Sequence, residues 1–194
     1  MLAQGWRRAL LALASGLVSV LALPPFHLWP VLFLTFPVLV RLLDGSGSGA
    51  RGVWRGALTG WLFGFGYLLA GLYWLGHAFL VDAKTFGWML PFAVLTVPAG
   101  LAIFPAAGTA LAQLLWTRGA PRILALAAAL TAAEWLRGHA LTGFPWNTFG
   151  YALTAPLALA QGAALVGIWG LTFLAISAIA TPAALTDSRA DTRR

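Results

Sequence analysis

Glu134 and Arg137 form the ionisable pair in this chain that is best placed to do chemistry. They are three residues apart in a segment expected to be helical, so their side chains share one face of that helix. Ionisable residues at membrane depth are costly to bury, and they are therefore candidates for a functional site. A purely structural role stays open, because Glu134 is close enough to the end of its segment for the pair to anchor the helix at the headgroup region.

The loop that follows this pair carries aromatic residues in a glycine and proline frame. Gly143 permits an unusual backbone turn, Pro145 stiffens the loop, and Trp146 presents a large amphipathic ring. Tryptophan is common at membrane interfaces and this chain contains 10, so a simple interfacial anchor is the alternative. We favour a contact with lipid acyl chains or headgroups. The candidate lipid-binding or substrate-binding residues are Glu134, Arg137, Phe144, Pro145, Trp146 and Tyr151.

Each of these residues has an expected role at a lipid. Arg137 pairs with a phosphate while Glu134 holds the guanidinium in position. Phe144 and Trp146 lie along the upper part of an acyl chain, and Pro145 keeps the two rings apart.

Thiol chemistry is excluded, because the sequence contains no cysteine. Disulfides, thiolate metal sites and a cysteine nucleophile are ruled out with it. The three histidines, His27, His77 and His139, match no local metal-ligand spacing, and no carboxylate pattern completes a set. Asn147 has no basic or hydroxyl partner arranged for catalysis. The sequence therefore gives no catalytic residue, no metal site and no cofactor.

The composition is that of an integral membrane protein. Of 194 residues, 60% are hydrophobic and 9% are charged, and the mean hydropathy is +0.85; a soluble domain is usually about 25% charged. The net charge of +7 does not indicate nucleic acid, because Lys and Arg flank the apolar runs and form no basic face with interleaved aromatics. We expect one membrane domain over residues 1–194 and no soluble domain.

Six apolar segments predict an all-α bundle of about six transmembrane helices. The first two have about 15 residues each and are short against a hydrocarbon core of about 30 Å. We expect them to form a hairpin at Pro24-Pro25 that turns inside the outer leaflet or is partly re-entrant. A cleavable signal peptide is the less favoured reading of the first segment, because further apolar segments follow at once. The expected spans are 9–23, 29–43, 53–75, 86–116, 121–139 and 155–185.

Small residues and prolines in these segments predict how the helices pack. Glycines recur every four residues in the third segment, and such a stripe lets another helix approach closely. They are Gly56, Gly60 and Gly64. Prolines recur every seven residues in the fourth segment, so the kinks that they cause fall on nearly one face. They are Pro91, Pro98 and Pro105.

The basic residues predict the orientation. Six spans place both termini on one side, and ten of the 12 Lys and Arg residues fall there, so the positive-inside rule makes both termini cytoplasmic. The ten are Arg7, Arg8, Arg41, Arg51, Arg55, Arg118, Arg122, Arg189, Arg193 and Arg194. The outer side receives Lys84 and Arg137, the three histidines and the loop that carries Trp146.

The stretch from Glu134 to Tyr151 reads E-x-L-R-G and then T-G-F-P-W-x-x-F-G-Y. This sequence motif resembles that of the apolipoprotein N-acyltransferase family. Two weaker features agree with it: the hairpin from Pro25 to Pro30, and the run from Gly60 to Gly66 that leads to Tyr73-Trp74. The resemblance implies a bacterial inner-membrane protein. Members of the family take an acyl chain from a phospholipid and transfer it to the N-terminal S-diacylglyceryl-cysteine of lipoproteins.

The family's catalytic Glu–Lys–Cys triad belongs to a nitrilase-like periplasmic domain, and none of it can be carried over to this sequence. Cysteine is absent, and the only lysine, Lys84, is in an expected membrane loop. We therefore expect a fragment, truncated product or part of a split gene that is inactive alone and supplies lipid access. Its expected partners are a phospholipid acyl donor, a lipoprotein N-terminus and a nitrilase-like domain in cis or in trans. The alternative is a stand-alone lipid-binding scaffold or small transporter.

Overall fold

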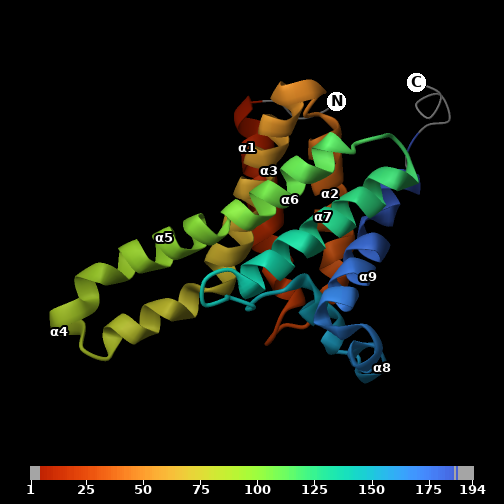
Figure 1. Cartoon of the computed structure of the whole chain (residues 1–194). Helices are drawn as coiled ribbons and strands as arrows, with labels where there is room; N and C mark the ends of the chain where they lie inside the picture. The colour runs from red at the N-terminus through yellow and green to blue at the C-terminus, as the bar shows by residue number, and fades with distance from the viewer. Residues whose placement is uncertain (1–4, 186, 188–194) are drawn as a thin grey trace.

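The computed structural model describes residues 5–185 and 187 (Figure 1). Within these residues the chain is mostly helical and has no strand, so the predicted all-α fold is confirmed. The elements, with 3-10 helices written η, are α1 (Gly5–Ser19), η1 (Val20–Ala22), η2 (Trp29–Val31), α2 (Leu32–Asp44), α3 (Gly49–Gly71), η3 (Tyr73–Leu80), α4 (Ala83–Phe86), η4 (Gly87–Met89), α5 (Leu90–Leu101), α6 (Ile103–Leu114), α7 (Ala120–His139), η5 (Phe149–Thr154), α8 (Leu157–Ala160) and α9 (Ala163–Leu185).

The predicted short hairpin is formed by α1 and α2, which have 15 and 13 residues. The Leu28 amide donates to the carbonyl of Leu21 at 2.8 Å and closes the turn between them. Deeper in the pair, the buried Ser19 hydroxyl donates to Ser15 O, and it lies 2.8 Å from the Thr35 hydroxyl. These bonds satisfy polar groups that would otherwise be buried without partners.

The predicted glycine stripe is confirmed, and its partner is α6. A Cβ atom added at Gly60 would lie 2.6 Å from the Pro105 carbonyl oxygen and closer still to the Thr109 hydroxyl. Pro105 fills the equivalent space at Gly64. The Thr109 hydroxyl donates to the carbonyl of Gly56 at 3.0 Å, a bond that only close helix approach allows. Small residues on α3 therefore set its distance from α6.

The prediction for residues 86–116 was only partly right. The chain forms α4, η4, α5 and α6 here, and its one break between the two longer helices is at Ala102. Pro105 follows this break in the first turn of α6, where its missing N–H leaves Leu101 O without an i+4 donor. Pro91 stands in the first turn of α5, where proline is tolerated, and Pro98 lies inside that helix.

The sixth predicted segment starts later than its sequence suggests. Residues 155–162 form a turn that includes the four-residue α8, and α9 begins at Ala163. Within α9, Gly167 has a φ of 65°, a value that glycine adopts readily and other residues rarely do. The apolar composition of 155–185 hid this interruption, because hydropathy alone does not report a turn.

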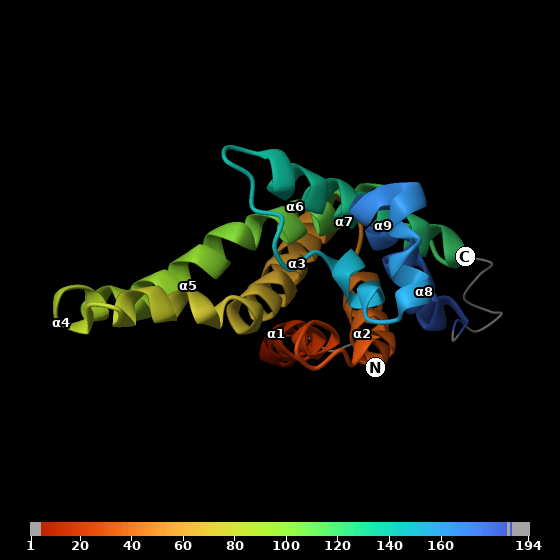
Figure 2. The same ribbon diagram turned by 90° about the horizontal axis from the view of Figure 1, so that it is seen from below.

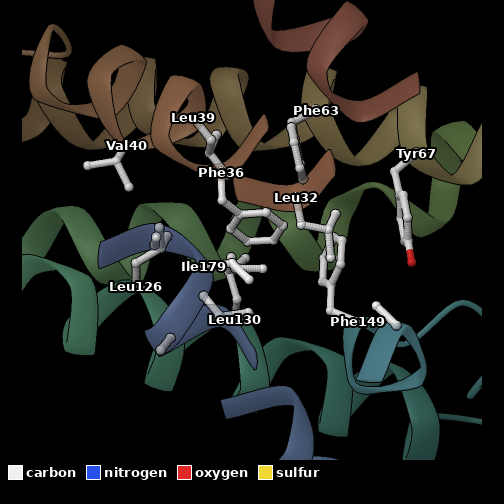
Figure 3. Packing of buried hydrophobic residues seen from close by; sticks show 14 of the residues in the cluster. Leu32, Phe36, Leu39, Val40, Phe63, Tyr67, Leu126, Leu130, Phe149 and Ile179 are labelled. Atoms are coloured by element: carbon white, nitrogen blue, oxygen red, sulfur yellow. The ribbon is translucent and has the colours of Figure 1, made fainter. Parts of the chain in front are cut away.

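The core lies where α2, α3, α7, α9 and η5 meet (Figure 3). Phe149, from the loop after α7, inserts among aromatic rings of two other helices. Its ring lies 4.9 Å from that of Phe36 and 4.5 Å from that of Tyr67, measured between centroids. Phe36 and Phe63 are fully buried beside it. The loop is thus fixed to the bundle at a point only two residues beyond Asn147.

Hydrogen bonds and ion pairs gather several helix ends at one end of the bundle. Arg8 of α1 donates to the carbonyl of Gly45 at 3.0 Å. Arg122 of α7 lies 3.1 Å from Asp44 and 2.6 Å from Asp187, which follows α9. We call this the Arg-rich end. Seven of the ten basic residues predicted to share a side belong to its helix ends and loops: Arg7, Arg8, Arg41, Arg51, Arg55, Arg118 and Arg122. The other three, Arg189, Arg193 and Arg194, lie outside the described residues.

The stretch from η3 to α5 projects away from the rest of the bundle, as Figures 1 and 2 both show. By length and composition, three helical stretches of the described chain can cross a membrane: Gly5–Ala22, Ala83–Leu114 and Ala163–Leu185. A fourth is possible if Gly49–Gly71 and Tyr73–Leu80, which meet at 45°, form one broken span. The predicted count of six spans stays a prediction.

Candidate lipid-binding site

Glu134 and Arg137 lie near the C-terminal end of α7 and are both buried. Their side chains are 9% and 3% exposed, and Arg137 Nη2 lies 3.7 Å from Glu134 Oε1. The two therefore form the ion pair that their spacing predicts. Two charges can remain buried only where their partners are close and further hydrogen bonds satisfy their remaining atoms.

Those further hydrogen bonds go to the loop after α7. Arg137 Nη1 donates to the carbonyls of Phe144 and Trp146 at 3.1 and 2.6 Å. The Phe149 amide donates to both carboxylate oxygens of Glu134 at 3.2 and 3.3 Å. The pair thus holds the loop on both sides of Asn147. The expected contact between Arg137 and a lipid phosphate does not fit this geometry, because the guanidinium faces protein carbonyls.

The loop backbone takes conformations that its sequence partly predicted. Gly143 has a φ of 74°, which confirms the unusual turn expected there. A side chain at this position would also meet the backbone of Gly138. Asn147 has a φ of 57°, and its side-chain amide packs where a Cβ atom of Gly71 would otherwise lie. The missing side chain at Gly71 therefore lets the loop pack against the end of α3.

A small cavity of about 20 Å³ lies beside Tyr67, Glu134 and Arg137. About 10–15 Å³ is enough for one water molecule. The cavity is therefore too small for a lipid chain. The buried ion pair beside it hydrogen-bonds the backbone of the loop.

A larger cleft of about 810 Å³ lies on the other side of this loop. Three parts of the chain form it: the turn between α1 and α2, the junction of α3 with η3, and the loop with η5. The lining residues are Val20, Leu23, Pro24, Pro25, Phe26, Ala70, Gly71, Tyr73, Trp74, Pro145, Trp146, Asn147, Tyr151 and Thr154. None of them carries a charge at neutral pH, so the cleft suits an apolar chain with few polar contacts.

The structure brings three of the six candidate residues, Pro145, Trp146 and Tyr151, into this cleft. Trp146 is 51% exposed. Phe144 instead packs against the core and also contacts Trp146, with 5.2 Å between the ring centroids. The expectation that Pro145 holds these two rings apart was therefore wrong.

Sequence reasoning missed the other aromatic residues of the cleft, Phe26, Tyr73 and Trp74. They are 56%, 64% and 42% exposed. A signal for them existed, because they belong to the Pro25–Pro30 hairpin and the Tyr73-Trp74 pair that stood out as motifs. Nothing in the sequence showed that these segments meet the loop after α7.

The histidine side chains are of a type that can bind metal ions. Among residues 5–185 and 187, no group of three or more His, Asp or Glu side chains is placed to hold a metal ion. His139 stacks on Trp135, with 4.5 Å between ring centroids, and its Nδ1 lies 2.7 Å from the Trp135 carbonyl oxygen. Its ring also lies 5.9 Å from that of Trp169 in α9, measured between centroids.

Comparison with known proteins identifies the family. The family description "Apolipoprotein N-acyltransferase N-terminal domain" matches residues 15–180. The chain belongs to the apolipoprotein N-acyltransferase family. The match covers the turn between α1 and α2, the glycine stripe, the Glu134–Arg137 pair and the whole of the cleft.

Curated relatives agree with this assignment. A protein of Rhodopseudomonas palustris named apolipoprotein N-acyltransferase is 59% identical over 194 residues, which are 100% of this chain and 36% of the relative. One of the same name from Bradyrhizobium diazoefficiens is 62% identical over 190 residues, 97% of this chain and 35% of the relative. The chain spans about a third of the length of these relatives.

Proposed function

We propose that this chain is the membrane part of an acyltransferase and supplies the cleft that receives an acyl chain of the phospholipid donor. The observation that carries the proposal is the cleft of about 810 Å³. It is walled by aromatic and proline side chains, it contains no charged group, and one side of it is the loop whose motif resembles the family. Apolar walls of this kind stabilise a lipid chain by burying its surface, at about 0.8 kcal/mol for each CH₂ group.

The residues of the site have two roles: some contact the acyl chain, and others hold the loop in position. Trp146, Trp74 and Tyr73 contact the acyl chain, and Pro145 gives the loop a rigid edge. Glu134 and Arg137 hold this loop in place through its backbone. The proposal therefore keeps the aromatic residues as the lipid contact and assigns the ion pair a supporting role.

The chemistry itself would come from the nitrilase-like domain that the resemblance implies, in cis or in trans. There a cysteine thiolate would attack the acyl ester of the phospholipid, which forms a thioester and releases a lysophospholipid. The amino group of the lipoprotein N-terminus would then attack the thioester, which forms an amide and returns the free thiol. A thiolate nucleophile is suited to such a two-step transfer. With no cysteine in its sequence, this chain contributes donor binding and a docking platform.

Orientation follows from the distribution of charge. The basic residues at the Arg-rich end favour the cytoplasmic side of the bacterial inner membrane by the positive-inside rule. The cleft is lined by the α1–α2 turn and the start of η3, which lie at the opposite ends of their helices, so we place it at the outer leaflet. A reporter enzyme fused within residues 80–85 should be active on the outer side. Activity on the cytoplasmic side would overturn this orientation.

Photo-crosslinking tests the proposed acyl-chain site. The chain is reconstituted with a phospholipid that carries a diazirine near the glycerol end of one acyl chain, and crosslinked peptides are mapped by mass spectrometry. We expect label in residues 20–26, 70–74 and 145–154, and less label after Trp146→Ala. The matched control is Trp54→Ala, because Trp54 is 71% exposed and outside the cleft. Label spread evenly over exposed residues would refute the site.

A further inference from the structure

A second cleft lies at the Arg-rich end, between the N-terminal turns of α1 and α3. Its volume is about 470 Å³. It is separate from the cleft of about 810 Å³ that Trp74 and Trp146 line, which we call the aromatic cleft, and it shares no lining residue with that cleft. The lining residues are Gly5, Arg8, Ala9, Gly45, Arg55, Leu58, Thr59 and Leu62. Two arginines therefore face one space.

Arg8 is held rigidly in the wall of this cleft by neutral acceptors. Its Nε donates to the Thr59 hydroxyl at 3.1 Å, and its Nη1 donates to the Gly45 carbonyl at 3.0 Å. Its Nη2 donates to Ser46 Oγ and Thr59 Oγ1 at 2.5 and 2.7 Å. Each Nη atom carries two hydrogens, so Nη1 keeps one donor for a ligand. Nη2 also lies 3.4 Å from the Arg55 carbonyl oxygen, so the guanidinium is preorganised by hydroxyl and carbonyl oxygens that carry no charge.

The positive charge of this cleft is not balanced by a carboxylate. Within the described part of the chain, neither Arg8 nor Arg55 forms an ion pair. The nearest acid in sequence, Asp44, directs its carboxylate to Arg122 instead, at 3.1 Å, and also to Arg41. Two like charges share a partly buried space, and an anion placed between them would be attracted by both.

The two leucines of the lining form an apolar side that continues along α3. Leu58 and Leu62 are one helical turn apart, and they lead from Arg55 toward the middle of the bundle. Leu58 is 49% exposed. The cleft thus has a cationic mouth and an apolar side, the arrangement that matches an anionic headgroup followed by its acyl chain. Basic pockets between helices on the cytoplasmic side of membranes bind such headgroups.

We propose that the cleft between α1 and α3 binds a phosphate group through Arg8 and Arg55, and that the phosphate belongs to the headgroup of an anionic phospholipid of the cytoplasmic leaflet. Arg8 donates from its free Nη1 hydrogen and Arg55 donates from its exposed guanidinium. Charge-assisted hydrogen bonds of this kind are stronger than neutral ones. The site is independent of the aromatic cleft, which lies at the opposite end of the bundle.

Native mass spectrometry of the purified chain tests this site. Adducts of phosphatidylglycerol are counted against those of phosphatidylcholine, each over a range of lipid concentrations. We expect preferential binding of phosphatidylglycerol, and about fivefold weaker binding after Arg55→Gln, as for the loss of one basic residue near an anionic surface. Arg8→Gln should weaken binding at least as much. Arg51→Gln is the matched control, because Arg51 is exposed on the same helix and does not line the cleft.

Three outcomes would overturn the proposal. The first is unchanged phosphatidylglycerol binding in Arg55→Gln, which should keep its fold because the Arg55 side chain is exposed and only its backbone carbonyl accepts hydrogen bonds in the described structure. The second is an equal loss in Arg51→Gln, which would show a diffuse effect of charge. The third is complete competition by millimolar inorganic phosphate, which would identify a site for the free anion. Melting temperatures of all variants separate lost binding from lost folding, and Arg55→Gln decides the test if Arg8→Gln does not fold.

Discussion

Replacement of Arg137 by methionine should release the loop after α7 from the bundle. Arg137 donates hydrogen bonds to two loop carbonyls, and hydrogen bonds that involve a charged group contribute about 1.5–3 kcal/mol each. The variant also leaves the Glu134 carboxylate buried without its cation, and the loss of one partner of a buried pair costs about 3–5 kcal/mol. These effects overlap. We therefore expect Arg137→Met to lower the free energy of unfolding by about 3–5 kcal/mol.

A second substitution tells whether the unpaired carboxylate is the cause. Glu134→Gln keeps an oxygen that accepts from the Phe149 amide, and it removes the buried charge. In the Arg137→Met background it should therefore recover part of the lost stability, with a coupling of about 1–3 kcal/mol in the double-mutant cycle. Arg137→Lys should lie in between, because one ammonium group cannot reproduce the fork of a guanidinium.

The assay is equilibrium unfolding in mixed micelles by titration with a denaturing detergent, followed by far-ultraviolet circular dichroism. Arg51→Gln serves as the control, and it should change the free energy of unfolding by less than about 0.5 kcal/mol, as exposed substitutions usually do. The reasoning is refuted if Arg137→Met costs less than about 1 kcal/mol. It is also refuted if Glu134→Gln adds to the loss instead of reversing part of it.

Three further results are expected. Gly60→Val should separate α3 from α6 and lower the melting temperature, because the valine side chain would meet the carbonyl of Pro105. The control Gly100→Ala should leave the melting temperature unchanged, because a Cβ atom there meets open space. Equal melting temperatures for the two variants would refute the proposed packing of α3 on α6. The Arg122 guanidinium donates to Asp187 and lowers the pKa of that carboxyl. The ion pair therefore stabilises the folded state fully at pH values above the ordinary pKa of aspartate. This stabilisation is lost as the pH falls through the lowered pKa of Asp187. Unfolding of Asp187→Asn and of the unchanged chain should accordingly differ at neutral pH and converge in acid, and a constant difference would contradict this. Finally, the purified chain alone should transfer no labelled acyl group from phospholipid to a diacylated lipopeptide, and transfer above a protein-free control would show that the nucleophile has been misplaced.

Helices with local signals could be predicted from the sequence. The fifth segment was expected at 121–139 and α7 runs over Ala120–His139, because Pro121 stands at its start. The glycine stripe also gave the packing face of α3, since small residues four apart favour close helix contact in any sequence. These features depend on residues near each other in the chain, and periodicity reports them.

Features that depend on distant residues could not be predicted. Arg137 was expected to face lipid, but its partners are carbonyls of the folded loop, and no sequence pattern reports a backbone acceptor. The aromatic cleft joins Phe26, Trp74 and Trp146 from three separate segments. The late start of α9 was hidden for another reason, because most residues of the preceding turn are apolar too.

The central claim, that the aromatic cleft receives the donor's acyl chain, is tested most directly by acyl transfer in a complete enzyme. This chain would be joined to the remainder of the Rhodopseudomonas palustris relative, which is 59% identical to it over their common part. With the double variant Trp74→Ala/Trp146→Ala we expect the rate of transfer from limiting phospholipid to fall about tenfold or more, since burial of each large apolar side chain contributes about 1.5–3 kcal/mol. Trp54→Ala should keep the full rate. Equal rates for the double variant and the control, with both proteins folded and membrane-inserted, would contradict the account.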